Sequence, residues 1–182
     1  RYKSRRPRLL LDRARADGLL VSTEAQMSEG DILDWPAGER DGFVFRPVNT
    51  VVNAFHLRSL TLVAELAEAL GKDTEAREHR DLERMARRAF QEKLFDPVSG
   101  LYRDGEGTEH SSLHANLFPL AFGLVPTPAR KGVVEWVAGR GMACSVYAAQ
   151  YLLEALFEHG EDRRALALLT ARPVPHNALD EP

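Results

Sequence analysis

Hydrophobic and polar positions along this chain alternate between two kinds of helical segment. In the first kind, apolar residues occupy nearly every face, as over 49–70, so such a helix must be buried on most sides. In the second kind, one apolar stripe recurs at helical spacing among charged residues, as over 73–95. The alternation returns twice more, at 113–124 followed by 128–137 and at 143–157 followed by 165–169. The pattern predicts three helical hairpins, each pairing a buried helix with an exposed one.

Glycine and capping residues mark the ends of these segments. Gly71 and Gly160 follow two of the apolar helices and are typical terminators. Asp73 or Thr74 in one case, and Asp162 in the other, can cap the helix that follows. The hairpin boundaries are therefore predicted independently of the apolar pattern.

Three further local features have simple interpretations. Pro119 should kink or interrupt the helix over 113–124. Residues 101–103 follow a turn and predict a short strand in a rim hairpin, and the loop 104–107 is expected to hold solvated acids. Residues 8–16 are expected to form an outer helix that precedes the first hairpin.

The alternation of buried and exposed helices decides between two all-α architectures. An up-down bundle makes all its helices similarly one-faced. A ring of inner helices wrapped by outer ones buries the inner member on both sides and behind, which is the pattern found here. The sequence therefore predicts an all-α ring of helical hairpins.

Composition narrows the class of protein. With 44% apolar and 28% charged residues, the chain is typical of a soluble globular domain. The net charge of −3 predicts neither nucleic acid nor an anionic membrane as partner. A basic cluster near the amino end is expected to be a solvated helix face. No apolar run is long enough to cross a bilayer, and the single cysteine, Cys144, is expected to be a buried thiol. These features do not distinguish a cytoplasmic from a secreted protein.

The segment DWPAGERDG, residues 34–42, concentrates candidate chemistry. It places three carboxylates, one guanidinium and one indole within nine residues. Carboxylates hydrogen-bond sugar hydroxyls and act as general acids, an aromatic plane covers the apolar face of a pyranose, and an arginine orients neighbouring carboxylates. The alternative is an exposed turn, because Asp, Pro and Gly are also common turn residues.

Three ordered segments resemble a known family. The segment DWPAGERDGFVFRPVNTVVNAF (34–55), the segment HSSLHANLFPLAFGLVP (110–126) and the segment GMACSVYAAQYLLEAL (141–156) resemble the bacterial α-L-rhamnosidases of glycoside hydrolase family 78. The resemblance implies an α/α toroid of six hairpins, of which this chain holds about half. An open half-ring leaves inner-helix surface uncovered, so either more chain completes it or it associates with the rest of the barrel or with another copy.

The resemblance also divides the chain. Residues 1–182 form a partial catalytic domain, in which 1–33 are a preceding helix and the loop that leads onward. A catalytic loop follows over 34–48, three hairpins over 49–170, and a tail over 171–182.

By the same resemblance, the site cleaves terminal rhamnose with inversion and needs no cofactor. The family pattern of this loop ends in an Arg-Asp-Glu run, but here Gly42 follows Arg40 and Asp41. Glu39 is therefore the candidate proton donor. Asp34 and Asp41 would bind hydroxyls, with Arg40 holding their charges in place.

Aromatic residues near the acids have two interpretations. Trp35 is expected to line the saccharide pocket. Core packing is favoured for Phe45. On the last apolar helix, Tyr147 and Gln150 could add polar groups to the cavity or only satisfy buried partners.

Two histidines and an asparagine follow in the second segment. His110 and His114 are four residues apart and share one helix face, with Asn116 nearby. A zinc site needs a further ligand, and none has suitable spacing, so no metal is expected. By the resemblance these three side chains reach sugar hydroxyls; capping and inter-helix hydrogen bonding is the alternative.

The family's general base belongs to a later Trp- and Glu-rich segment, which residues 171–182 do not match. Glu181 is a poor candidate because it lies in the tail. The chain is therefore expected to hold the acid without the base and to be inactive alone. Two alternatives stay open: a different α/α-toroid glycosidase, and a helical-hairpin scaffold that binds a protein and catalyses nothing.

Overall fold

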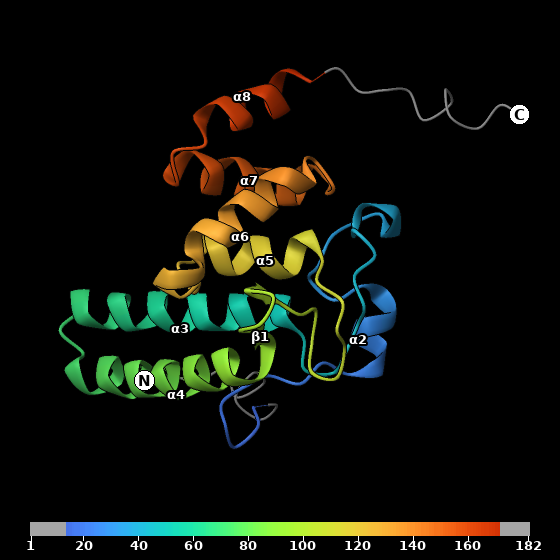
Figure 1. The fold of residues 1–182 in the computed structure, drawn as a ribbon. Coiled ribbons are helices and arrows are strands. Elements are labelled where there is room, and N and C mark those ends of the chain that lie inside the picture. The colour runs from blue at the N-terminus through green and yellow to red at the C-terminus, as the bar shows by residue number, and fades with distance from the viewer. Residues whose placement is uncertain (1–13, 172–182) are drawn as a thin grey trace, which may run out of the picture.

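A computed structural model describes residues 14–171 as a succession of helices with one small hairpin (Figure 1). A short helix α2 and a 3-10 turn η1 come first, followed by six longer helices. The elements are α2 (Glu24–Glu29), η1 (Ala37–Glu39), α3 (Thr50–Ala69), α4 (Asp73–Leu94), β1 (Phe95–Asp96), β2 (Leu101–Tyr102), α5 (Leu113–Ala121), α6 (Thr127–Arg140), α7 (Val146–Glu158) and α8 (Asp162–Thr170).

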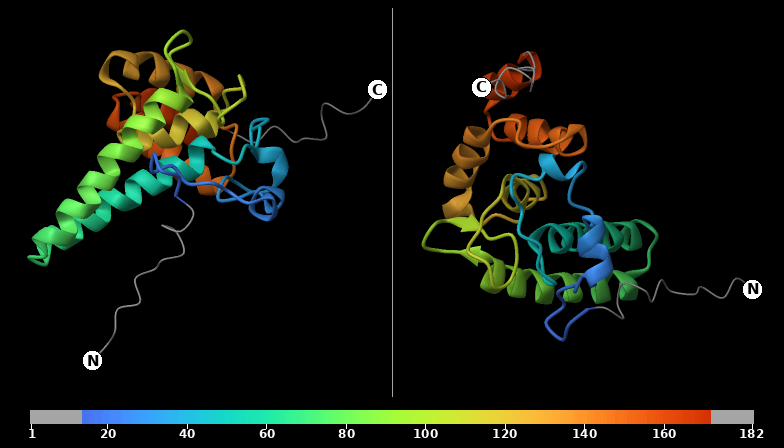
Figure 2. Two further views of the ribbon diagram at one scale, coloured as in Figure 1. Left: turned by 90° about the horizontal axis from the view of Figure 1, so that it is seen from below. Right: turned by 90° about the vertical axis from the view of Figure 1, so that its right-hand side faces the viewer.

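The six long helices form the three predicted hairpins, α3–α4, α5–α6 and α7–α8. Helix α5 packs against both α3 and α7, and each even-numbered helix packs against an odd-numbered partner. Figure 2 shows these elements following an arc rather than a compact bundle. The prediction of an all-α toroid, present in part, is confirmed.

The amino ends of the inner helices α3, α5 and α7 lie on one side of the molecule, the side that carries α2 (Figure 1). Each of them begins with a polar side chain that accepts a hydrogen bond from its own first turn. Asn49 Oδ1 accepts from Val52 N at 2.9 Å, and Ser112 and Ser145 cap α5 and α7 in the same way. Caps of this kind stabilise a helix by about 1 kcal/mol.

The outer helices begin differently from the sequence expectation. Lys72 and Glu161 occupy the N-cap positions of α4 and α8, without a side-chain cap. Asp73 and Asp162 are instead the first helical residues, where a negative charge interacts favourably with the helix dipole.

The rim hairpin has the predicted place. β1 and β2 are antiparallel, with Phe95 opposite Tyr102 and Asp96 opposite Leu101.

Pro119 lies inside α5, which continues for only two residues beyond it. Helix α2 was not predicted; it begins with a reciprocal capping box between Thr23 and Gln26.

The core between the inner helices is aromatic. Phe118 of α5 is fully buried, and its ring centroid lies 4.9 Å from that of Phe55 on α3 and 5.2 Å from that of Tyr151 on α7. Phe122 packs on the same Phe55 ring at 4.9 Å. One cluster therefore joins all three hairpins.

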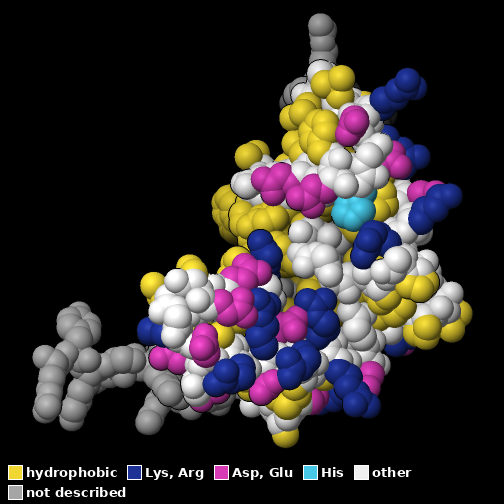
Figure 3. Space-filling model, turned by 90° about the vertical axis from the view of Figure 1, so that its left-hand side faces the viewer, with side chains coloured by type: hydrophobic (Ala, Val, Ile, Leu, Met, Phe, Trp, Pro, Cys, Tyr) yellow, Lys and Arg dark blue, Asp and Glu magenta, His cyan; other side chains and the backbone are white. Residues whose placement is uncertain are grey.

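The expectation that α3 is buried on most sides is correct only for its first half. In the second half Leu62, Val63, Leu66 and Leu70 are 40%, 42%, 63% and 70% exposed. Figure 1 shows why: the α3–α4 hairpin extends beyond α5, so α4 is the only described neighbour that covers this half. Figure 3 looks onto this end of the molecule and shows apolar side chains in patches between charged ones.

Some expectations fall wholly or partly outside the described residues. Most of the helix expected over 8–16 does, and its last residues are not helical, since Ala14 forms a β-bridge with Leu20. The tail from 172 onward also lies outside. Within 14–171, no helix combines the length and apolarity needed to span a bilayer.

We expect Phe118→Ala to lower the free energy of unfolding by about 3–5 kcal/mol, because it leaves a cavity at the junction of three helices. Urea unfolding monitored by circular dichroism measures this loss. Val98→Ala, on a side chain that is 93% exposed, is the matched control and should change stability by less than about 0.5 kcal/mol. Equal stability of the two variants would contradict the assignment of this core.

Candidate functional site

The loop over 34–48 lies against the amino ends of the inner helices, and Asp34 is its main anchor. The Asp34 side chain is fully buried. Its Oδ2 accepts hydrogen bonds from His114 Nε2 at 2.8 Å and from the Ser145 backbone N–H at 3.0 Å. Its Oδ1 accepts from the Trp35 N–H at 2.8 Å and from the Ser145 hydroxyl. One carboxylate thus joins the loop to both α5 and α7.

These hydrogen bonds determine the charge of Asp34. Burial alone raises the pKa of a carboxyl group, but the hydrogen bonds from Ser145, His114 and Trp35 outweigh it, so the pKa of Asp34 is lowered. Asp34 is therefore ionised at neutral pH, and His114 must carry a proton on Nε2 to donate to it. The other ring nitrogen, Nδ1, is buried without a partner among the described residues.

Asp41 forms a second anchor. Its Oδ2 accepts from the Leu113 N–H at 2.6 Å and from Arg140 Nε at 3.2 Å, and its Oδ1 pairs with the Arg140 guanidinium. Leu113 is the first residue of α5 and Arg140 the last of α6. The second carboxylate of the loop therefore ties it to the α5–α6 hairpin.

Asp104 forms a third anchor, and the expectation that it is solvated was wrong. Its side chain is fully buried. Oδ1 accepts from Ser112 N at 2.8 Å, while Oδ2 accepts from Val44 N at 2.8 Å and lies 2.6 Å from His110 Nδ1. An acid in a Gly-rich loop looks the same whether it is solvated or buried, so no local signal distinguishes this role.

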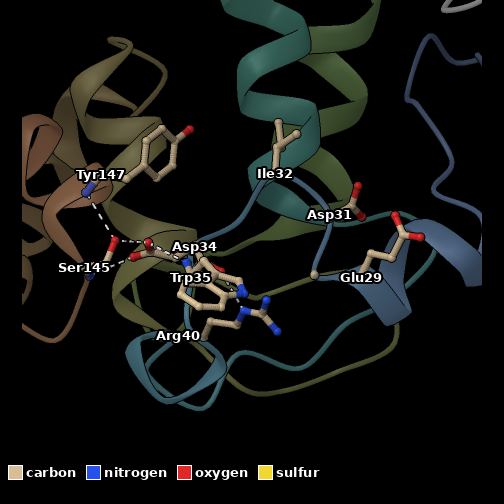
Figure 4. A pocket seen from close by; sticks show the side chains of 9 residues that line it. Glu29, Asp31, Ile32, Asp34, Trp35, Arg40, Ser145 and Tyr147 are labelled. Carbon is tan, nitrogen blue, oxygen red and sulfur yellow. Dashed lines mark hydrogen bonds between the residues drawn. The ribbon is translucent and has the colours of Figure 1, made fainter.

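A cavity of about 380 Å³ opens beside the first anchor (Figure 4). Its lining comes from the end of α2, from the loop and from the start of α7. The residues are Glu29, Gly30, Asp31, Ile32, Asp34, Trp35, Arg40, Ser145 and Tyr147. The structure therefore brings together three of the predicted residues, Asp34, Trp35 and Arg40, and adds Glu29, Asp31 and Ile32, which the sequence analysis missed.

Trp35 and Arg40 face the cavity in different ways. The Trp35 side chain is 76% exposed and offers an open ring face. Arg40 Nε donates to the Asp34 backbone carbonyl at 2.8 Å, and its guanidinium carbon lies 5.5 Å from the centre of the Phe45 ring. Phe45 is half-buried against the core, as expected.

Gly30 makes room for this guanidinium. A Cβ atom built on Gly30 would lie 2.0 Å from Arg40 Nη2, and its φ of 95° lies in the left-handed region. The backbone conformation favours glycine here, and any side chain would displace the guanidinium from this place.

Glu39, the candidate proton donor, ends the η1 turn and is half-buried. It lies in the same loop as the pocket residues but does not line the cavity. Asp41 also lies outside the lining, because its carboxylate is directed to Leu113 and Arg140.

The second-segment residues serve the scaffold in this structure. His114 is buried against Asp34, and the Asn116 amide bonds the backbone of Tyr102 and Ser112. Both residues are fully buried, which supports the hydrogen-bonding alternative over sugar contact. His110 is bound to Asp104 but remains partly exposed.

The α7 residues separate in their roles. Tyr147 lines the cavity. Burial, and to a smaller extent the charges of Tyr151 and Asp34, raises the pKa of its hydroxyl to about 12. Gln150 instead bonds Glu154 on the helix surface. Cys144 is buried as predicted, and burial raises the pKa of its thiol to about 12, so it is a poor nucleophile. Between residues 14 and 171, no three His, Cys, Asp or Glu side chains gather so that they could hold a metal ion.

Comparison with known proteins identifies relatives of this arrangement. Residues 11–177 match the bacterial alpha-L-rhamnosidase 6 hairpin glycosidase domain. No curated protein shows a significant sequence match.

Solved structures show the same fold. The chain is similar to a GH78 family rhamnosidase of Bacillus sp. GL1, with a TM-score of 0.71 and 18% identity over 87% of this chain and 17% of that one. It is also similar to a Klebsiella oxytoca rhamnosidase with rhamnose bound, with a TM-score of 0.69 and 21% identity over 88% of this chain and 30% of that one. A third similar structure is that of a Streptomyces avermitilis alpha-L-rhamnosidase complexed with L-rhamnose. Its TM-score is 0.69, with 22% identity over 92% of this chain and 15% of that one. The chain thus spans less than a third of each of these proteins.

We expect Asp34→Asn to lower the free energy of unfolding by about 2 kcal/mol at pH 7, because charge-assisted hydrogen bonds are lost. The folded-state pKa lies below the unfolded value of about 3.9, so this contribution is complete above that pH and is lost as the pH falls through the folded pKa. Urea unfolding at pH 7 and at pH values below about 4 should show the wild-type advantage shrinking. An advantage that is independent of pH would contradict the charged anchor, and Asp81→Asn, at an exposed position within α4, is the control.

We expect Asp104→Asn to lower the free energy of unfolding by about 3 kcal/mol or more. Each carboxylate oxygen now accepts a hydrogen bond from a backbone N–H, and the NH₂ group of asparagine would have to face one of these donors. Chemical denaturation measures the loss. Asp81→Asn, at an exposed position of α4, should leave stability within about 0.5 kcal/mol. A similarly small effect at Asp104 would show that its buried hydrogen bonds do not hold the loop.

Proposed function

This chain belongs to the bacterial α-L-rhamnosidase six-hairpin glycosidase family, and from this premise we propose that it contributes to the catalytic ring of a glycoside hydrolase that releases terminal α-L-rhamnose from glycans or glycosides. One observation carries the proposal: an open cavity at the amino ends of the inner helices is lined by an exposed indole, a guanidinium and an anchored carboxylate. These are the groups that bind sugars. Rhamnose is bound in two of the similar structures.

Substrate binding is assigned to the cavity residues. The Trp35 ring offers a flat apolar surface to the CH groups of a pyranose. Arg40 uses Nε to hold the loop, which leaves its terminal nitrogens as donors to hydroxyl oxygens. Asp34 is ionised and packed between two helices, so it supports the wall of the cavity rather than titrating in it.

The proposed reaction proceeds with inversion. A carboxylic acid protonates the leaving oxygen while a carboxylate about 6.5–9.5 Å away activates water. Asp34 is unsuited to donate the proton because its pKa is lowered. Asp41 is occupied by Arg140 and Leu113. We therefore keep Glu39 as the proposed donor, in a loop held by both aspartates.

The activating carboxylate is not assigned to any described residue. We propose that it is supplied by residues beyond this segment and that the 182-residue chain is inactive alone. The activity test therefore uses the intact protein that carries this chain.

We expect Glu39→Gln to lower kcat for an aryl α-L-rhamnoside by about 10²- to 10⁴-fold, the usual contribution of a general acid. Release of the aryl alcohol measures the rate, and NMR of the first sugar product determines whether the anomer is inverted. Glu109→Gln, at a rim position where Glu109 pairs with Arg103, is the matched control and should keep full activity. Full activity of Glu39→Gln would move the donor role to another residue.

A panel of other aryl glycosides separates this proposal from a different toroid glycosidase. Hydrolysis of a glucoside or uronide in preference to the rhamnoside would replace the proposed substrate.

A further inference from the structure

Ile32 lies in the cavity wall with its side chain 46% exposed. A single exposed isoleucine is ordinary on a protein surface. Here, however, the backbone on both sides is held in place. Asp31 N donates to Gln26 O at 2.7 Å and Leu33 N donates to Gly30 O at 3.2 Å, while the next side chain, Leu33, is 1% exposed. Ile32 is therefore presented to the cavity by a fixed segment.

The neighbouring residue strengthens this constraint. Asp31 has a φ of 53°, in the left-handed region, and its Oδ2 accepts from Asn49 Nδ2 at 3.1 Å. Asn49 caps α3. The wall that carries Ile32 is thereby attached to an inner helix of the ring.

The cavity has an apolar and a polar part. Figure 4 shows Ile32 and Tyr147 along the upper edge, Asp31 and Glu29 at the right, and Trp35 and Arg40 together below. A ligand that fits such a cavity has hydroxyl groups on one side and a carbon group on the other.

Charge restricts the ligand further. The lining holds three carboxylates, Glu29, Asp31 and Asp34, against one guanidinium, Arg40. An anionic sugar would meet net repulsion there. The cavity therefore favours a neutral sugar that carries an alkyl group.

We propose that Ile32 contacts the C6 methyl group of a 6-deoxy sugar and so selects an α-L-rhamnoside over an α-L-mannoside, which differs from it only by a hydroxyl on that carbon. The proposal rests on the proposed function. A hydroxyl pressed against an aliphatic side chain loses its hydrogen bonds to water without gaining a partner. Apolar contacts of this kind discriminate by about 10- to 100-fold.

The test compares kcat/KM for 4-nitrophenyl α-L-rhamnoside and 4-nitrophenyl α-L-mannoside in the intact protein. Wild type should prefer the rhamnoside by about 10- to 100-fold, and Ile32→Ser should reduce this ratio by about tenfold. Ile32→Val keeps an apolar group and should retain most of the preference. Val98→Ser, at the exposed rim turn, should leave the ratio unchanged, and circular dichroism establishes that each variant is folded.

An unchanged ratio in Ile32→Ser, or a wild type without preference, would overturn the role of Ile32 while leaving the rhamnosidase assignment intact. If wild type hydrolysed neither glycoside, the proposed function would fail, and calorimetric binding of free L-rhamnose and L-mannose would decide the Ile32 proposal. Equal binding of the two sugars, or binding of neither, would overturn it.

Discussion

Buried carboxylates on the amino ends of helices are the interaction on which this structure depends. The first N–H groups of a helix have no partner within it and carry a partial positive charge. Asp104 and Asp41 accept from Ser112 and Leu113 at the start of α5, and Asp34 accepts from Ser145 at the start of α7. The same contacts position the loop that forms the cavity. Fold and site are therefore stabilised by one set of hydrogen bonds.

The helical hairpins could be predicted from sequence because each helix carries its own pattern of apolar positions. The burial of the aspartates could not be predicted, because it depends on hydrogen-bond partners that are distant along the chain. Ser145 lies 111 residues from Asp34, and Val44 lies 60 from Asp104. Trp35 and Arg40 line the cavity, whereas Glu29, Asp31 and Ile32 were missed, because neither the short helix α2 nor the turn after it shows a periodic pattern.

Reading α3 as buried on most sides failed for a related reason. The apolar pattern shows which faces can be covered, but it does not show where the neighbours end. The first half of α3 packs against α5, while Leu66 and Leu70 near the far end of this helix are exposed. The pattern therefore identified the apolar faces of the helix but gave no information on which of them have a neighbour.

The empty place beside Gly30 has a consequence for the cation of the cavity. Gly30 is the C-terminal cap of α2, and the guanidinium rests where any side chain at this position would be. Because Arg40 Nε is already bound to the Asp34 carbonyl, a side chain at position 30 would displace only the terminal nitrogens. The missing side chain at one helix end thus leaves the space in which the cation stands beside the cavity.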